Sequence, residues 1–143
     1  MRLSDKDREL LATLSENARV PVSALAKKLG LSRTTVQARL ERLEREGVIA
    51  GYSVRLSEEY TSGLVKAHIL ITMAPKSLAQ VTRSLEKMKA VTELHSVSGS
   101  FDLIAIIVAP SISELDQLID EIGVVEGVER TLSSIVLSTR ISR

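Results

Sequence analysis

Two short helical patterns joined by a tight turn span residues 21–49, and this pairing restricts the possible folds of the chain more than any other feature. Three apolar residues share one face of the first pattern, as an amphipathic helix requires. They are Leu25, Ala26 and Leu29. Gly30 follows, where a left-handed residue can end a helix, and Ser32 is a favourable N-cap for the second helix. The sequence therefore predicts a helix-turn-helix unit with its turn at residues 30–33.

The second helix is expected to have one buried side and one exposed side. Its inward stripe consists of Val36, Leu40 and Leu43, and its outward side of Thr34, Gln37, Ala38 and Glu41. A third helix is available upstream, because Ser4 and Asp7 have the spacing of a capping box. The apolar face of that helix consists of Leu10, Leu11 and Leu14. Three such helices are enough for a complete small core.

The exposed side of the second helix is a candidate surface for reading DNA. A helix fits the major groove, and its first turns bring short polar side chains to base edges. Those turns hold Ser32, Arg33, Thr34, Thr35 and Gln37. Residues 19–45 contain seven basic side chains against two acidic ones, whereas the whole chain has a net charge of only +1. This local positive charge suits phosphate neutralisation, although amphipathic helices with mixed charges also occur in ordinary bundles.

Composition and the lack of cysteine exclude several classes of protein. With 143 residues, 44% of them hydrophobic, the chain can form one domain or two small ones. No run approaches the roughly 20 apolar residues of a membrane span, and the N-terminus lacks the apolar core of a signal peptide. We therefore expect a cytoplasmic protein. Without cysteine the chain has no disulfides and no thiolate metal ligands.

The histidines and acidic side chains of the sequence do not form a pattern typical of an enzyme active site. His68 and His95 fall on different expected strands, and neither has a serine or an acid at a spacing typical of a nucleophile system. Asp116, Asp120 and Glu121 share part of a helix surface without a nearby histidine or cysteine, which favours a solvated acidic face. The chain also has no glycine-rich phosphate loop. We expect no catalytic residues, no metal ligands and no cofactor.

A change of composition at residues 57–63 predicts a linker between two domains. The helical, arginine-rich part before it, residues 1–56, is the expected DNA-binding domain, and residues 64–143 form the second domain. Within the first part, residues 51–56 alternate weakly between apolar and polar side chains. This alternation predicts a short strand that leads away from the recognition helix.

Beyond the linker, apolar strands and amphipathic helices alternate in the order βαββαβ. The expected elements are Leu64–Met73, Leu78–Met88, Val91–Val97, Phe101–Val108, Glu114–Ile122 and Val128–Leu137. The two halves resemble each other, since each has a strand that ends in Ala-Pro, then a serine-led helix, then a strand. This pattern predicts an α+β chain whose second domain has the ferredoxin-like split βαβ arrangement, with right-handed crossovers.

Both faces of the predicted sheet are apolar, and this feature bears on assembly. Along one strand Phe101, Leu103, Ala105 and Ile107 point one way, and Ile104, Ile106 and Val108 point the other way. The two helices would cover one face with Leu78, Val81, Leu85 and Met88 and with Leu115, Leu118, Ile119 and Ile122. A large exposed apolar patch is unfavourable in a monomer, so the second face is expected to pack against another copy of the chain. We expect a homodimer, which also presents two recognition helices to DNA.

Three segments together resemble the Lrp/AsnC family, the leucine-responsive or feast/famine transcriptional regulators of bacteria and archaea. They are LSDKDRELLATLSENARVPVSALAKKLGLSRTTVQARLERLEREGVIAGY, SVSGSFDLIAIIV and VERTLSSIVLS. The resemblance covers nearly the whole chain. It implies a winged-type helix-turn-helix domain followed by a ferredoxin-like effector and dimerisation domain, with further assembly to tetramers or octamers. It also implies that an amino acid or a related small molecule binds at interfaces between dimers.

The resemblance also assigns site residues. The recognition helix of the family falls on Ser32–Glu46, and Arg39 matches a basic position expected to touch DNA; Arg42 belongs to the same basic set. The glycine-and-acid turn of the effector domain falls on Gly99, Ser100, Phe101 and Asp102. Here Ser100 stands where an acid is frequent in the family and Phe101 where tyrosine is frequent, which removes a charge and a hydroxyl group from the pocket.

The residues of this turn also favour ligand binding on physical grounds, apart from the resemblance. Gly99 can adopt a positive φ and present backbone N–H groups to a carboxylate, while Asp102 can pair with an ammonium group. Alternatively, the glycine makes a plain hairpin turn and the acid bonds to backbone. Thr131, Ser133 and Ser134 either line the same pocket or form hydrogen bonds across strands.

Together these features predict a sequence-specific, DNA-binding transcriptional regulator whose assembly or DNA affinity responds to a small molecule, most simply an amino acid. One alternative is an architectural protein that organises DNA with little sequence preference and has no effector. Another is an RNA-binding sheet, which is disfavoured because such sheets stack bases on aromatic side chains and the expected strands offer only Phe101.

Overall fold

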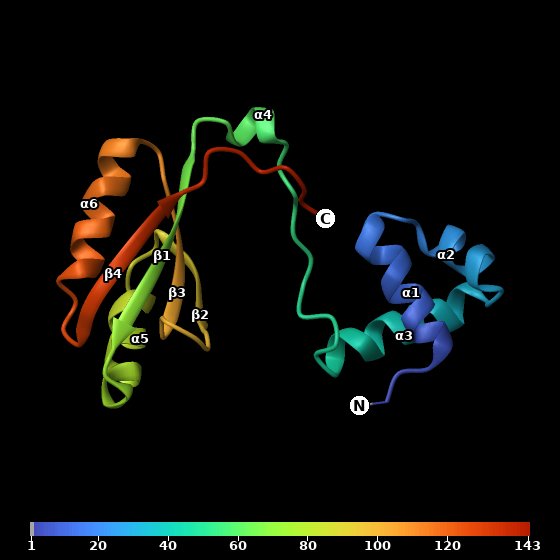
Figure 1. Ribbon diagram of the computed structural model, residues 1–143. Helices are drawn as coiled ribbons and strands as arrows, with labels where there is room; N and C mark the ends of the chain where they lie inside the picture. The colour runs from blue at the N-terminus through green and yellow to red at the C-terminus, as the bar shows by residue number, and fades with distance from the viewer. Residues whose placement is uncertain (1) are drawn as a thin grey trace. The chain divides into compact units, whose positions relative to one another are not determined.

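The computed structural model describes residues 2–143 and divides them into two compact units, of which the first ends at Arg55 and the second is Leu56–Arg143 (Figure 1). Each unit has its own hydrophobic core. No helix in the described part of the chain is long and apolar enough to cross a membrane. The two units are considered separately below.

The first unit is a bundle of three helices, as the sequence predicts. They are α1 (Asp5–Glu16), α2 (Val22–Leu29) and α3 (Arg33–Arg45). Its core consists of Leu10, Leu25, Ala26, Leu29, Val36, Leu40 and Leu43. These are the apolar positions expected from helical spacing, except that Leu11 and Leu14 are only half-buried at the edge of the core.

The turn between α2 and α3 has the helix caps that the sequence predicts. Gly30 ends α2 in the left-handed region with φ 67°, and Leu31 donates its backbone N–H to the carbonyl of Ala26 at 3.0 Å. Ser32 then begins α3 as its N-cap, because its hydroxyl accepts the N–H of Thr35 at 3.1 Å. These caps confirm the predicted helix-turn-helix geometry.

The strand predicted at residues 51–56 is wrong. That segment forms no strand, and most of its side chains are exposed. A strand requires a hydrogen-bonded neighbour, and weak alternation in the sequence cannot supply one. The segment expected as a linker, 57–63, contains a single helical turn, α4 (Glu58–Thr61), which Ser57 caps.

The second unit has the predicted βαββαβ order. Its elements are β1 (Val65–Met73), a 3₁₀ turn at Pro75–Ser77, α5 (Leu78–Glu86), β2 (Val91–Ser96), β3 (Leu103–Ala109), α6 (Ile112–Gly123) and β4 (Val128–Ile135). The four strands form one sheet in the order β2-β3-β1-β4, and all three pairings are antiparallel. This topology confirms the ferredoxin-like arrangement.

Both helices of the second unit pack on one face of the sheet (Figure 1). Val81 and Leu85 of α5 and Leu115 and Ile122 of α6 are fully buried against alternate residues of the strands. Leu78 was expected among them, but it begins α5 and is 41% exposed. The other face of the sheet has no helix in the described unit, and Ile104, Ile106 and Val108 lie half-buried on it, as the alternation predicts.

Candidate nucleic-acid interface and effector turn

The outward side of α3 presents polar side chains to solvent. Each of the five residues expected at its first turns is exposed: Ser32, Arg33, Thr34, Thr35 and Gln37. A shallow surface hollow beside them is lined by Val22, Arg33, Thr34, Gln37, Ala38 and Glu41. The structure therefore brings Arg33, Thr34 and Gln37 together around this hollow, whereas Ser32 and Thr35 are exposed but do not line it.

Two of these five residues, Ser32 and Thr35, also form the N-cap of α3. The hydroxyl groups of Ser32 and Thr35 lie 2.7 Å apart, in addition to the cap bond from the Thr35 N–H. The amide of Gln37 donates to the carboxylate of Glu41 at 3.2 Å, so it is already oriented along the helix surface. Arg33 and Thr34 have exposed side chains next to the hollow, where a groove-bound base or phosphate has access.

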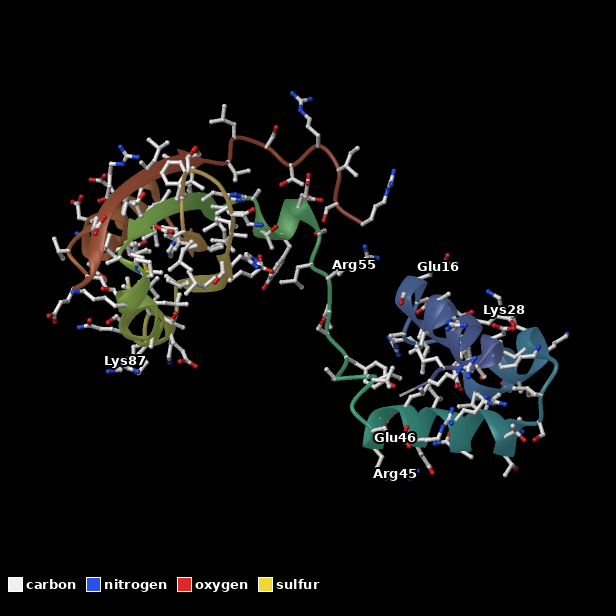
Figure 2. The ribbon with its side chains drawn as sticks, turned by 60° about the horizontal axis from the view of Figure 1, so that its bottom comes forward. Glu16, Lys28, Arg45, Glu46, Arg55 and Lys87 are labelled. Atoms are coloured by element: carbon white, nitrogen blue, oxygen red, sulfur yellow. The ribbon has the colours of Figure 1, made fainter. Side chains whose placement is uncertain are left out.

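Four basic side chains on α2 and α3 are exposed and form no ion pair with any residue that the structure describes. They are Lys27 and Lys28 at the end of α2, and Arg33 and Arg45 on α3. Lys28 and Arg45 are both on the outside of the unit in Figure 2. These unpaired cations are the ones best placed to neutralise phosphates.

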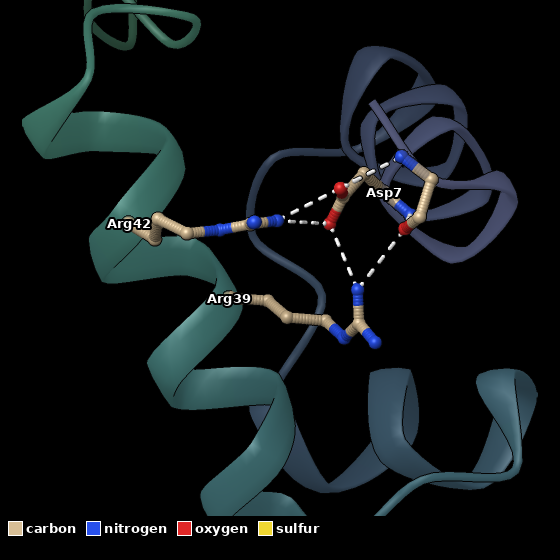
Figure 3. Close-up of polar contacts among 4 residues, drawn as sticks. Asp7, Arg39 and Arg42 are labelled. Carbon is tan, nitrogen blue, oxygen red and sulfur yellow. Dashed lines mark hydrogen bonds and ion pairs between the residues drawn. The ribbon is translucent and has the colours of Figure 1, made fainter. Parts of the chain in front are cut away.

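Arg39 and Arg42, which were also assigned to DNA, point instead to α1 (Figure 3). Nη1 of Arg39 donates to Oδ1 of Asp7 at 3.0 Å, and Nη2 of Arg42 lies 2.8 Å from both carboxylate oxygens of Asp7. Arg39 also donates to the hydroxyl of Ser4 at 3.1 Å. Both arginines therefore have partners inside the protein.

The carboxylate of Asp7 is 1% exposed, yet its surroundings keep it charged. Burial by itself raises the pKa of the Asp7 carboxyl, but hydrogen bonds from the backbone N–H of Ser4, from Arg42, from the side chain of Ser4 and from Arg39 outweigh burial. The pKa of Asp7 consequently lies well below its usual range.

Sequence reasoning gave Asp7 only a capping role, which the structure confirms through mutual hydrogen bonds with Ser4. A further signal was present in the helical spacing. Asp7 is three residues before Leu10, so it lies on the apolar face of α1, where an acid needs a buried partner. Arg39 borders the inward stripe of α3, and Arg42 follows one turn later, so these two side chains were the available cations.

The turn between β2 and β3, which the sequence predicts as an effector site, has the backbone expected of its glycine. Gly99 adopts φ 116°, and the N–H of Val97 donates to the carbonyl of Asp102 at 3.0 Å. Asp102 is fixed to the neighbouring strand β1. Its Oδ2 accepts the N–H of Met73 at 3.0 Å, and its own N–H donates to the carbonyl of Ile71 at 2.9 Å. One carboxylate oxygen is thus used to hold the turn.

Arg130 is a residue of this turn region that sequence reasoning missed. It lies opposite Thr72 in the β1–β4 pairing, and its guanidinium carbon is 5.9 Å from the centre of the Phe101 ring. That distance is within the range of a cation–π interaction. A charged residue on β4 becomes a neighbour of the turn only through the sheet register, so nothing in the linear spacing indicates it.

The three polar residues of β4 do not share one surface. Thr131 and Ser133 pair with Ile71 and Ile69, whereas the adjacent Ser134 pairs with His68. Successive strand residues point to opposite faces of the sheet. Ser134 therefore lies on the face that no helix of the described unit covers, which we call the open face, and Thr131 and Ser133 lie on the helix-covered face. The structure therefore does not bring all three to a common pocket, and only Thr131 and Ser133 are on one side.

A helix-turn-helix unit with exposed polar and basic side chains, followed by a ferredoxin-like domain, is the architecture of a two-domain regulator of transcription. Family models match both parts: residues 3–50 match a winged helix-turn-helix DNA-binding domain, and residues 66–143 match the Lrp/AsnC ligand-binding domain. The chain belongs to the Lrp/AsnC family of transcriptional regulators.

Individual relatives agree over almost the entire chain. The HTH-type transcriptional regulator LrpA of Pyrococcus horikoshii is 32% identical over 94% of this chain and 96% of its own length. LrpA of Mycobacterium tuberculosis is 35% identical over 96% and 91%. The structure of E. coli AsnC, 28% identical, covers 100% of this chain and 97% of its own, with a TM-score of 0.90. These relatives are DNA-binding regulators rather than enzymes, and they give no support to the architectural alternative.

Proposed function

We propose that this chain reads its operator with the exposed first turns of α3 and neutralises phosphates with the unpaired cations around them. The observation that carries the proposal is the exposure of Ser32, Arg33, Thr34, Thr35 and Gln37 at the N-terminal turns of a capped helix. The hollow beside Arg33 and Thr34 lies next to these side chains. A recognition helix uses its N-terminal residues at base edges in the same way.

A competition assay tests this proposal directly. Genomic fragments are selected for binding to the full chain, and the best fragment is then competed with random duplex at a fixed salt concentration. A regulator should prefer its operator by roughly 10³ or more over random DNA. Equal competition by random duplex would instead support the architectural alternative.

A matched pair of variants assigns the specificity to α3. Replacing Gln37 with Ala should reduce the preference for the operator, because its amide can read a base edge. Replacing Ser15, which is exposed on α1, with Ala should leave the preference unchanged. If both variants keep the preference, Gln37 does not read DNA.

We also propose that the second unit binds an amino acid at the turn of Gly99, Ser100, Phe101 and Asp102. The supporting observations are the positive φ of Gly99 and the second oxygen of Asp102, which is not needed for the bond to Met73. A regulator from Neisseria meningitidis with the same fold, at 24% identity and a TM-score of 0.88, is described as a complex with L-Met. L-Met is therefore the first amino acid to test.

The proposed regulation acts through assembly. Gly99 and Ser100 of the turn are exposed on the surface of one chain, and Phe101 and Asp102 are half-buried, so we expect a ligand there to be enclosed only when a second subunit covers it. A small molecule at such an interface favours one arrangement of dimers, and this changes how many helix pairs engage DNA together. Dimers would form through the open face of the sheet and would join into tetramers or octamers.

Two substitutions at Asp102 separate a ligand contact from a structural one. The Asn variant keeps an oxygen for the N–H of Met73 but loses the charge, whereas the Ala variant loses both. If Asp102 pairs with the ammonium group of the effector, both variants should lose the rise in melting temperature that the effector causes. An Asn variant that responds like the parent protein would limit Asp102 to holding the turn.

A further inference from the structure

The recognition helix is tied to α1 by a network of four side chains that the proposed DNA contacts do not use. Asp7 is at the centre, and Ser4, Arg39 and Arg42 surround it (Figure 3). Ser4 is the N-cap of α1 and Asp7 lies in its first turn, while Arg39 and Arg42 are 32 and 35 residues after Asp7 on α3. The network therefore joins two elements that are remote in sequence.

The position of the two arginines on α3 explains why they reach α1 and not the outward side. An α-helix turns by about 100° per residue, so Arg39 is about 140° around the axis from Thr34. Arg42 lies between Arg39 and the outward side, and the side chains of Arg39 and Arg42 are only 27% and 36% exposed. Arg45, in contrast, shares the outward side with Thr34 and is exposed without an ion pair among the described residues.

The chemistry of the network favours a fixed geometry. Arg42 approaches both oxygens of Asp7 at 2.8 Å, and Arg39 adds a third contact to the same carboxylate at 3.0 Å. Hydrogen bonds between ionised groups are shorter and more directional than neutral ones. Loss of one partner leaves the buried carboxylate, or the arginines facing it, without compensation.

We infer that Asp7 is a positioning residue for DNA recognition, which holds α3 through Arg39 and Arg42, and that these two arginines bind the protein rather than phosphates. This inference rests on the proposed DNA-binding role of α3. It assigns the phosphate contacts of α3 to Arg33 and Arg45, although charge and family resemblance alone point to Arg39.

The first test is the salt dependence of binding to a mixed-sequence duplex by the full chain. The slope of log K against log salt falls in magnitude by about 0.9 for each lost phosphate contact. Arg45→Gln, the control on the outward side of the same helix, should show this loss and keep its melting temperature. Arg42→Gln should keep the slope of the parent protein and melt at a lower temperature. A slope loss of about 0.9 in Arg42→Gln would overturn the inference, whatever its melting temperature.

A second test needs no DNA and uses milder variants. Lysine keeps the positive charge but cannot span both oxygens of a carboxylate, so Arg42→Lys should lower the melting temperature by about 5 °C or more. Asp7→Asn combined with Arg42→Gln should lose less than the sum of the two single losses, because the same contact is removed twice. Additive losses, or an unshifted Arg42→Lys, would overturn the inference. A parent protein that binds no duplex would refute the proposed function, while this second test still decides the network.

Discussion

At the scale of single residues, the helical unit depends on a charged group in an apolar place. Asp7 is almost as buried as Leu10 of the same helix, and it is stable there only because Ser4 and two arginines compensate its charge. Its pKa is lowered relative to the ordinary value of 3.8. A carboxyl group whose pKa is lower in the folded state than in the unfolded state stabilises the fold at every pH above its pKa in the unfolded state. This stabilisation is lost as the pH falls toward the pKa of the group in the folded state.

We therefore predict a pH-dependent effect of Asp7→Asn. At pH 7 the variant should lose about 3 kcal/mol of stability, as expected when one partner of a buried pair is removed. The difference should stay constant down to about pH 5 and shrink below about pH 4, because unfolding of the parent protein is then accompanied by proton uptake at Asp7, which the Asn variant lacks. Thermal unfolding of both proteins from pH 2 to pH 7 measures this. A difference that does not change over that range would rule out the charge as its source.

At the scale of elements, the turn between α2 and α3 depends on one backbone conformation. Gly30 has φ 67°, and a Cβ built at this position meets no atom within 4 Å. A side chain there would thus be opposed by backbone strain alone, without a steric clash. The caps on both sides of Gly30 then determine where α2 ends and α3 begins.

We predict that Gly30→Ala destabilises the protein by about 1 kcal/mol, the usual strain of an L-residue in the left-handed region. Urea unfolding of the full chain measures the loss. Gly51→Ala is the matched control, because Gly51 is exposed, has no positive φ and also has free space around a Cβ. Its effect should stay within about 0.5 kcal/mol. Equal effects at both positions would contradict the role of the left-handed turn.

At the scale of the whole molecule, the apolar open face of the sheet is the feature that predicts self-association. Leu70, Ile104 and Ile106 lie on this face in neighbouring strands, and no helix of the described unit covers them. Leu132 continues the patch on β4 and is 54% exposed. A contiguous apolar patch of this kind is typical of a protein interface.

We predict that Ile106→Asp weakens self-association by at least about 100-fold, because each copy of a two-fold interface would bury an unpaired charge. Sedimentation of the protein over a range of concentrations measures the dissociation constant. The control is Gln117→Glu, which adds a charge to an exposed position on α6, and it should associate like the parent protein. A dimer that persists unchanged in Ile106→Asp would mean that the chains associate through another surface.

The sequence by itself determined the elements, because local rules govern them. Helical spacing and caps predicted α1, α2 and α3, and the alternation of apolar residues predicted the four strands and their order. Where the prediction from sequence was wrong, the sequence did not show whether a neighbouring strand was available. The weak alternation at residues 51–56 has no neighbouring strand, so it forms no ladder.

Only the tertiary structure decided which side chains meet. Arg39 and Arg42 carry the same charge as Arg45, yet packing of α1 against α3 gives the first two a buried carboxylate and leaves Arg45 exposed. The sheet register likewise brings Arg130 to Phe101 and places Ser134 on the face opposite to Ser133. Spacing along the chain determines faces and ends of elements, whereas contacts between remote residues depend on how those elements pack.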